Sequence, residues 1–261
     1  MIKGLPPGTI LQLMYLRERL AAVPPGRFVE IGPGAGHITS LLLESGWTGD
    51  AFDLEAQTVD GLRQRFHEAI EANRLRVHQA DFVTHGEQLV GAVDLVISCM
   101  VMEHLDDAQE AAFMDTSAQL LRPDGRMIGL VPGSPAAWGI EDDIAGHLRR
   151  YTRPALDALA RRTGWRLLHT SGLTYPVSNL LLPVSNWLVT RHEKNKLALP
   201  VLDRTKQSGR RQVRFKTHFP SLLNGVLNDI TMRPLHWLQK GAASAEAALV
   251  LYFEAQPAGG R

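Results

Sequence analysis

Three alternate glycines mark the part of this sequence whose residue types and spacing could bind a nucleotide-type ligand. Residues 28–36 read Phe-Val-Glu-Ile-Gly-Pro-Gly-Ala-Gly, an apolar segment that breaks into the glycines. A turn without Cβ atoms lets a ligand approach the backbone. The helix expected after the turn presents free N–H groups and a positive dipole end to an anionic group. The turn therefore predicts where a ligand binds, without choosing among nucleotide-type cofactors.

Three acidic residues narrow that choice. Asp53 follows the glycines by about 20 residues, where a carboxylate can accept both ribose hydroxyls. Asp81, beside the apolar Phe82, suits an adenine with its exocyclic amine, and Glu30 can hold the turn or accept from a cationic amino group. A nicotinamide enzyme would share Asp53, but its Gly-x-Gly-x-x-Gly spacing requires glycine where this sequence has His37. The alternative is that the three acids lie on a solvated rim.

The elements that must position these residues alternate along the chain. Apolar runs predict strands at 28–31, 51–52, 75–80, 93–98, 127–131, 165–170 and 248–253. Helical spacing predicts helices at 8–22, 37–45, 58–71, 108–121 and 154–163, with a turn at 123–125. Such alternation predicts a doubly wound parallel sheet of the α/β class, whose ligands lie outside the carboxyl ends of the strands. The glycines and acids all fall on such ends.

Composition is that of an ordinary globular protein. The 261 residues are 44% hydrophobic and 21% charged, with a net charge of +1, so attraction of the whole molecule to nucleic acid or to an anionic membrane is not indicated. Cys99 is the only cysteine, which excludes an intrachain disulfide and fits a reducing compartment. The first residues lack the pattern of a signal peptide, and no apolar run approaches the roughly 20 residues of a membrane span. We expect a soluble, cytoplasmic protein.

At these motifs the sequence resembles the class I S-adenosylmethionine-dependent methyltransferases, over roughly residues 25–173. The resemblance is carried by Glu30-Ile-Gly-Pro-Gly-Ala-Gly36, Asp53, Asp81-Phe82, the strand 94–98 leading to Met102-Glu103-His104-Leu105, and Leu121-Arg-Pro-Asp-Gly125. It implies a Rossmann-like, mostly parallel seven-stranded sheet with an antiparallel last strand. It also implies S-adenosyl-L-methionine as cofactor and S-adenosyl-L-homocysteine as product.

The family's cofactor contacts carry over to matching positions. The glycine turn would hold the methionine part, the acid after the second strand the ribose, and the Asp after the third strand the adenine. Residues ending the fourth strand would flank the cofactor and the reacting methyl group. The cofactor-binding residues implied are Glu30, Gly32, Gly34, Gly36, Asp53, Leu54, Asp81, Phe82, Ser98, Cys99 and Glu103.

Two histidines are candidates for a general base, which a hydroxyl or protonated amine acceptor requires. His104 follows the fourth strand and His147 the fifth, and each has the alternative of a structural role. His147 belongs to Gly146-His-Leu-Arg-Arg-Tyr-Thr152, which resembles a segment of a bacterial subgroup acting on small molecules or sugar-linked substrates. Tyr151 of that segment could donate to a substrate oxygen or pack in the core.

Charged neighbours of the histidines have two interpretations each. Arg149 and Arg150 offer forked donors for an anionic substrate, or they form ion pairs with the acids at 141–143. Glu103, His104, Asp106 and Asp107 could hold a metal, by analogy with metal-assisted quinone O-methyltransferases, or the acids could cap the next helix. We expect capping and no metal, and we expect Cys99 to be a small buried residue and not a nucleophile.

The second half departs from a minimal version of the fold, because about 75 residues (174–247) connect the strand at 165–170 to the last strand. We expect a helical segment at 1–26, the cofactor-binding core at 27–173, an insertion at 174–247 and the last strand at 248–256. The insertion joins an apolar run to a basic one, and the pattern over 222–238 predicts one or two helices broken at Pro234. It is interpreted as a lid that recognises the acceptor. A membrane-surface element over 179–216, a homodimerisation arm or a solvated loop are the alternatives.

The sequence therefore predicts a methyltransferase acting on an oxygen, less readily a nitrogen, of a small-molecule or sugar-linked acceptor, with no nucleic-acid partner. A nicotinamide-dependent oxidoreductase and a non-catalytic cofactor-binding subunit are the alternatives.

Overall fold

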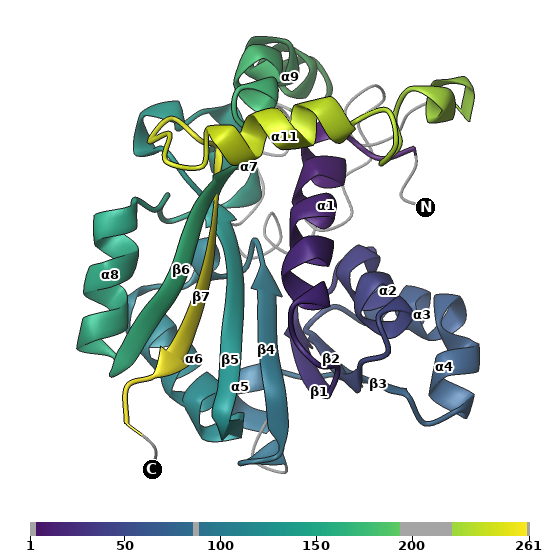
Figure 1. Ribbon diagram of the computed structural model, residues 1–261, viewed down its shortest axis with the longest axis vertical. Helices are drawn as coiled ribbons and strands as arrows, with labels where there is room; N and C mark the ends of the chain where they lie inside the picture. Colours follow the sequence, from purple (N-terminus) through teal and green to yellow (C-terminus); the bar gives the residue numbers. More distant parts are fainter. Residues whose placement is uncertain (1–3, 86–88, 194–220, 260–261) are drawn as a thin grey trace. The chain divides into compact units, whose positions relative to one another are not determined.

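A seven-stranded sheet organises the computed structural model, which describes residues 4–85, 89–193 and 221–259 (Figure 1). The strand order is β3-β2-β1-β4-β5-β7-β6. The strands are β1 (Arg27–Ile31), β2 (Thr48–Asp53), β3 (Leu75–Gln79), β4 (Val93–Cys99), β5 (Leu121–Pro132), β6 (Trp165–Leu173) and β7 (Val250–Pro257). The pairs among β1 to β5 are parallel, and β7 is antiparallel to its neighbours. The predicted fold class is confirmed.

Helices connect the strands. The α-helices are α1 (Pro7–Ala21), α2 (His37–Glu44), α3 (Ala56–Arg65), α4 (His67–Glu71), α5 (Phe82–His85), α6 (Asp107–Leu120), α7 (Ile140–Ala145), α8 (Arg153–Arg162), α9 (Val177–Glu193) and α11 (Arg233–Gly241). Short 3-10 helices are η2 (Met102–His104), η3 (Pro135–Ala137) and η5 (Ser221–Gly225). None of the helices within the described ranges has the length and apolar character needed to cross a bilayer.

The chain forms two compact units. The first, here called the glycine-loop unit, comprises Val23–Val131, Arg153–Thr170 and Tyr252–Arg261. In this unit α2, α3 and α4 pack against β2 and β3, and α6 packs against β4. Strands β1 and β4 are neighbours in the sheet although they are far apart in the sequence. The order in which the chain adds strands to the sheet reverses between β1 and β4, and doubly wound sheets bind ligands at this point.

The second unit, here called the helical unit, comprises Met1–Ala22, Pro132–Thr152 and Ser171–Leu251. Its α1 packs on both α9 and α11. Ile10, Leu11 and Met14 of α1 form an apolar cluster with Leu227 and Met232. The unit thus joins the N-terminal helix to the predicted insertion. The basic stretch of that insertion, from Lys194 to Lys216, lies outside the described residues.

Three elements differ from the sequence predictions. The helix predicted at 58–71 is two helices separated at Phe66. The turn predicted at 123–125 lies inside β5, where the pairing with β4 changes register between Val93 and Leu95. Pro234 does not break a helix but stands in the first turn of α11, where its missing N–H costs no helical hydrogen bond.

Candidate functional site

The glycine loop follows β1 with all three glycines at positive φ. Gly32, Gly34 and Gly36 have φ of 68°, 51° and 74°, a region that L side chains rarely adopt. The Gly32 N–H donates to the carbonyl of Phe52 on β2 at 3.0 Å, and Gly36 is the N-cap residue of α2. The loop therefore presents its backbone at the start of a helix, as the sequence predicts.

Close packing also requires glycine at positions 32 and 36, because neighbouring side chains leave no room for a Cβ atom. A Cβ on Gly32 would lie 2.5 Å from Cγ2 of Val101, just beyond β4. A Cβ on Gly36 would lie 2.6 Å from the ring of Phe66. The guanidinium of Arg65 donates to the carbonyl of Ala35 and so holds the middle of the loop. The break between α3 and α4 thus places Phe66 and Arg65 against the glycine loop.

Glu30 is a buried carboxyl beneath this loop. Its side chain accepts a hydrogen bond from the Thr39 hydroxyl of α2 at 2.6 Å, and the residue is 2% exposed. Burial raises the pKa of Glu30 to about 7, although the Thr39 hydrogen bond opposes the increase. Asp53 adds a smaller repulsion that acts in the same direction as burial. Glu30 is therefore a carboxyl that changes charge near neutral pH.

This shift predicts a pH-dependent stability. The folded chain holds the Glu30 proton up to about pH 7, whereas the unfolded chain loses it near the ordinary pKa of 4.5. The folded chain therefore loses stability as the pH rises from 4.5 to 7, by on the order of 3 kcal/mol. We expect Glu30→Gln to remove this decline in the free energy of unfolding, measured by urea denaturation across that range. The exposed Glu71→Gln should keep it, and an unchanged slope in Glu30→Gln would contradict the assignment.

Asp53 ends β2 close to the glycine loop. Its carboxylate accepts from the backbone N–H of Glu55 at 2.9 Å and from that of Gly34. Burial raises the pKa of Asp53, and these backbone hydrogen bonds act against the increase. Leu54 beside it is 58% exposed, which leaves an apolar side chain at this edge of the sheet.

The other predicted adenine contacts lie after β3. Asp81 is exposed, and its Oδ1 accepts from the N–H of Val83 at the start of α5. Phe82 is 3% exposed and packs between the rings of Phe52 and Phe113, with centroids 6.0 and 5.5 Å away. The carboxylate of this pair is thus at the surface, whereas the ring belongs to the core.

The end of β4 brings polar groups to the same edge. Ser98 is buried, and its Oγ has no hydrogen-bond partner among the described residues. Burial raises the pKa of the Cys99 thiol to about 12, so the thiol stays protonated and is a poor nucleophile. The next residue, Met100, has a φ of 56°, a strained conformation of the kind found at functional sites. A ligand atom that bonds the Ser98 hydroxyl is consistent with this arrangement.

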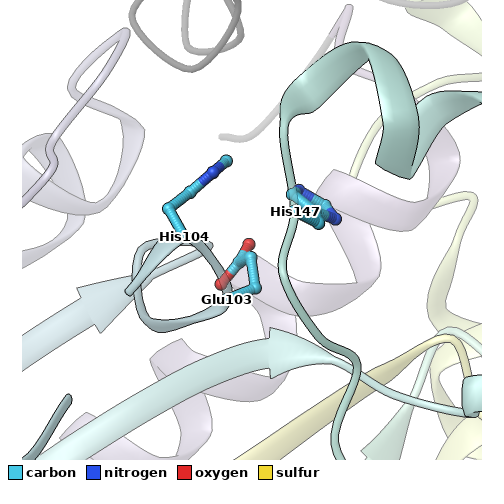
Figure 2. Close-up of side chains that lie close together, drawn as sticks. All are labelled: Glu103, His104 and His147. Carbon is cyan, nitrogen blue, oxygen red and sulfur yellow. The ribbon is translucent and has the colours of Figure 1, made fainter. Parts of the chain in front are cut away.

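Glu103 and His104 project from η2, and Figure 2 shows their side chains. Glu103 is fully buried, and His104 is partly exposed. A carboxylate and an imidazole are both possible metal ligands. Asp106 is the N-cap of α6 in a capping box with Gln109, so this acid caps the helix, as predicted from the sequence.

His147 lies after α7 and is held by a buried acid. Its Nδ1 lies 2.8 Å from Oδ1 of Asp142, and the histidine side chain is 14% exposed. Burial alone would raise the pKa of Asp142, but hydrogen bonds from His147, Arg150 and the Gly139 N–H outweigh it and lower this pKa to about 2. An ionised Asp142 accepts a hydrogen bond from Nδ1–H, so Nε2 is the basic nitrogen of the neutral ring.

The remaining residues of this segment have different surroundings. Arg150 donates to Asp142 at 2.9 Å and to the Gly133 carbonyl at 2.9 Å, so the ion pair that the sequence left open is present. Arg149 is half-buried. Tyr151 is 3% exposed, and its N–H donates to the carbonyl of Pro132. Arg150 therefore stiffens the segment that carries His147.

Two residues that position the site were not singled out in the sequence: Thr39 holds Glu30, and Arg65 holds the glycine loop. Asp142, which holds His147, was one of the three acids considered as ion-pair partners of the arginines. It lies inside α7 and precedes His147 and Arg150 by five and eight residues. The other two contacts depend on tertiary packing.

Comparison with known proteins supplies the family. A family model described as a methyltransferase domain matches residues 10–170. Ribosomal RNA small subunit methyltransferase A of Methylococcus capsulatus is 38% identical over 104 residues, which are 35% of this chain and 39% of that protein. Ubiquinone biosynthesis O-methyltransferase of Sodalis glossinidius is 26% identical over 129 residues, 49% of this chain and 50% of that protein. The chain spans half or less of the length of these curated relatives.

A solved structure shares the fold. The 1,6-didemethyltoxoflavin-N1-methyltransferase of Burkholderia thailandensis, with bound 1,6-didemethyltoxoflavin and S-adenosylhomocysteine, aligns with a TM-score of 0.52. It is 20% identical, and the alignment covers 65% of this chain and 73% of that one.

Proposed function

This chain belongs to the methyltransferase-domain family, and we propose that it transfers a methyl group from S-adenosyl-L-methionine to an oxygen of a small-molecule or sugar-linked acceptor. Transfer to nitrogen is the less favoured form of the same proposal. Family membership argues against the nicotinamide alternative, for which His37 already lacks the required glycine. What remains to be assigned is which residues hold the cofactor and which prepare the acceptor.

The glycine-loop unit would hold the cofactor. The backbone of the loop and the N-terminus of α2 would receive the methionine part, with the ionisable Glu30 beneath it. Asp53 and the exposed Leu54 would contact the ribose side, and Asp81 would accept from the adenine amine. The buried Ser98 hydroxyl offers a hydrogen bond to the bound molecule. The sulfonium of this cofactor supplies an activated methyl group, so the protein has mainly to place the acceptor and exclude water.

The Asp142–His147 pair is the observation that carries transfer to oxygen. A hydroxyl acceptor must lose its proton, and a base of suitable geometry accelerates that loss. Asp142 fixes the ring with Nδ1 protonated, so His147 would take the acceptor proton at Nε2. Arg150 and the Gly133 carbonyl hold this arrangement. His104 is the second candidate for the base, because it follows β4 on η2.

The contacts of the insertion support a role for it in acceptor recognition. Within the helical unit α9 packs on α7, and the Ser185 hydroxyl donates to Glu141 at 2.6 Å. The insertion is therefore anchored to the helix that precedes His147. We propose that this anchoring lets α9 contribute to the choice of acceptor, with Arg149 as a donor to an anionic group.

Turnover with a panel of acceptors tests the proposed function. The purified chain is incubated with labelled S-adenosylmethionine and phenolic, sugar-linked, amine or carboxylate acceptors, and with ribosomal RNA because one relative is named for that substrate. We expect methylated hydroxyl products by mass spectrometry, and retention of S-adenosylhomocysteine but not of NAD.

Each other result has a definite meaning. A methylated amine would show that the acceptor atom is nitrogen and not oxygen. Methylated ribosomal RNA would contradict a small-molecule acceptor. Retained S-adenosylhomocysteine without turnover of any acceptor would favour the non-catalytic subunit. Failure to retain S-adenosylhomocysteine would contradict the cofactor.

A further inference from the structure

Helix α9 exposes a stripe of apolar side chains. Leu180, Val184 and Trp187 are 77%, 56% and 61% exposed. Their spacing of four and then three residues places them on one face of the helix. Arg191 continues the same stripe, and its guanidinium lies 5.9 Å from the centroid of the Trp187 ring. The outward face of α9 is therefore apolar and ends in a cation.

The face of α9 that packs on the helical unit mixes apolar and polar side chains. Val189 is fully buried, and Val177 packs on the apolar cluster of α1. Asn179 donates to the carbonyl of Ala247 at 2.8 Å, and Ser185 donates to Glu141 at 2.6 Å. A surface helix ordinarily buries its apolar side and exposes its polar side. In α9 large apolar side chains lie on both sides, and the exposed stripe indicates a partner outside this unit.

Helix α11 also exposes large apolar side chains. Trp237 and Leu238 are 68% and 48% exposed, whereas His236 and Gln239 of the same helix are 2% and 1% exposed and bond Glu18 and the Leu11 carbonyl of α1. Val226 and Ile230, in the segment before α11, are 64% and 54% exposed. The tryptophan surface is defined here by the exposed stripe of α9 and by these four residues: Leu180, Val184, Trp187, Val226, Ile230, Trp237 and Leu238.

Charge indicates what covers the tryptophan surface. Its elements carry the exposed cations Arg191 and Arg233, whereas the acid Asp229 is 14% exposed and bound to Arg17. From 191 to 216 the sequence has nine Lys or Arg and two Asp or Glu, although the whole chain has a net charge of only +1. In a twofold dimer a second copy would present the same Arg191 and Arg233 on the same surface. An anionic partner is favoured instead.

We propose that the tryptophan surface docks on an anionic lipid bilayer. Exposed tryptophans belong to the interface of a membrane, where the ring is apolar and its N–H stays hydrated. Arg191 and Arg233 add attraction to anionic headgroups, and the sequence that follows α9 is rich in Lys and Arg. The helices rest on the bilayer and do not cross it. This inference does not depend on the proposed methyl transfer, and it gives access to acceptors carried on lipids.

Vesicle binding tests the proposal with the full chain. Sedimentation is measured with phosphatidylcholine vesicles and with vesicles that also contain phosphatidylglycerol. We expect binding only to the latter, weakened by salt, and about tenfold or more weaker for the double variant Trp187→Gln/Trp237→Gln. Leu168→Gln, which alters a 40% exposed leucine on β6 of the glycine-loop unit, should bind like the native chain.

Three results would overturn the proposal. These are no binding to the anionic vesicles, equal binding by the double variant, and a native dimer that the double variant dissociates in analytical ultracentrifugation. Thermal unfolding checks that the double variant folds. If it does not, brominated lipids are added to the Trp138→Phe variant, in which Trp187 and Trp237 are the exposed tryptophans because Trp47 and Trp165 are buried, and quenching of its emission decides. Absence of quenching would equally exclude docking.

Discussion

Valine in place of Gly34 is expected to abolish the binding of S-adenosylhomocysteine, with an affinity loss on the order of 100-fold or more by titration calorimetry. Gly34 has a φ of 51° in the middle of the loop, and its N–H bonds Asp53. A branched side chain would both strain this backbone and fill the space through which a ligand approaches it. We expect the fold to persist, with a cost of about 1–2 kcal/mol from the positive φ.

Gly164→Val is the matched control. Gly164 also has a positive φ, of 72°, but it follows α8, and a Cβ there meets nothing within 4 Å. This variant should lose similar stability in thermal unfolding and keep its affinity for S-adenosylhomocysteine. Unchanged affinity in Gly34→Val would refute the placement of the cofactor at the glycine loop.

Alanine in place of His147 is expected to lower kcat by about 10²–10⁴-fold while leaving S-adenosylhomocysteine binding intact. The imidazole is the proposed base, and none of the cofactor contacts proposed above involves it. Asp142→Asn should lower kcat as well, because an amide can donate to Nδ1 and so favour the wrong tautomer. Steady-state kinetics on a hydroxyl acceptor, together with calorimetry, would measure both effects.

His104→Ala separates the two candidate bases. If this variant loses turnover and His147→Ala does not, the roles are exchanged. Asp142→Asn also weakens the partner of Arg150, so its thermal unfolding must be compared with that of the native chain. Asp142→Glu keeps the charge and should recover part of the turnover.

The parts of the site that were predictable from sequence are those specified by local rules. The glycines need positive φ, and Asp53 stands at the end of a strand, so order and spacing located both. Asp106 as a helix cap follows equally from local chemistry. The parallel part of the sheet followed from the alternation of apolar runs and helical segments, whereas the antiparallel last strand was implied by the family resemblance.

Contacts across the fold were not predictable in this way. Thr39 reaches Glu30 only because α2 turns back over β1, and Phe66 packs on Gly36 only because the helix predicted at 58–71 breaks. The orientation of α9 was equally hidden. Its sequence is apolar with a few polar residues, and the buried Val189 together with the hydrogen bonds of Asn179 and Ser185 shows which side faces inward.

The helical unit has a consequence for how such an enzyme can change during evolution. It is assembled from three separate stretches of the chain, and its core joins Leu11 of α1 to Leu227 and Met232 some two hundred residues later. Salt bridges of Arg17 with Asp229 and Glu18 with Lys240 tie the same two stretches together. A unit built in this way cannot be gained, lost or exchanged as one contiguous piece of gene. The N-terminal helix and the insertion must therefore vary in concert.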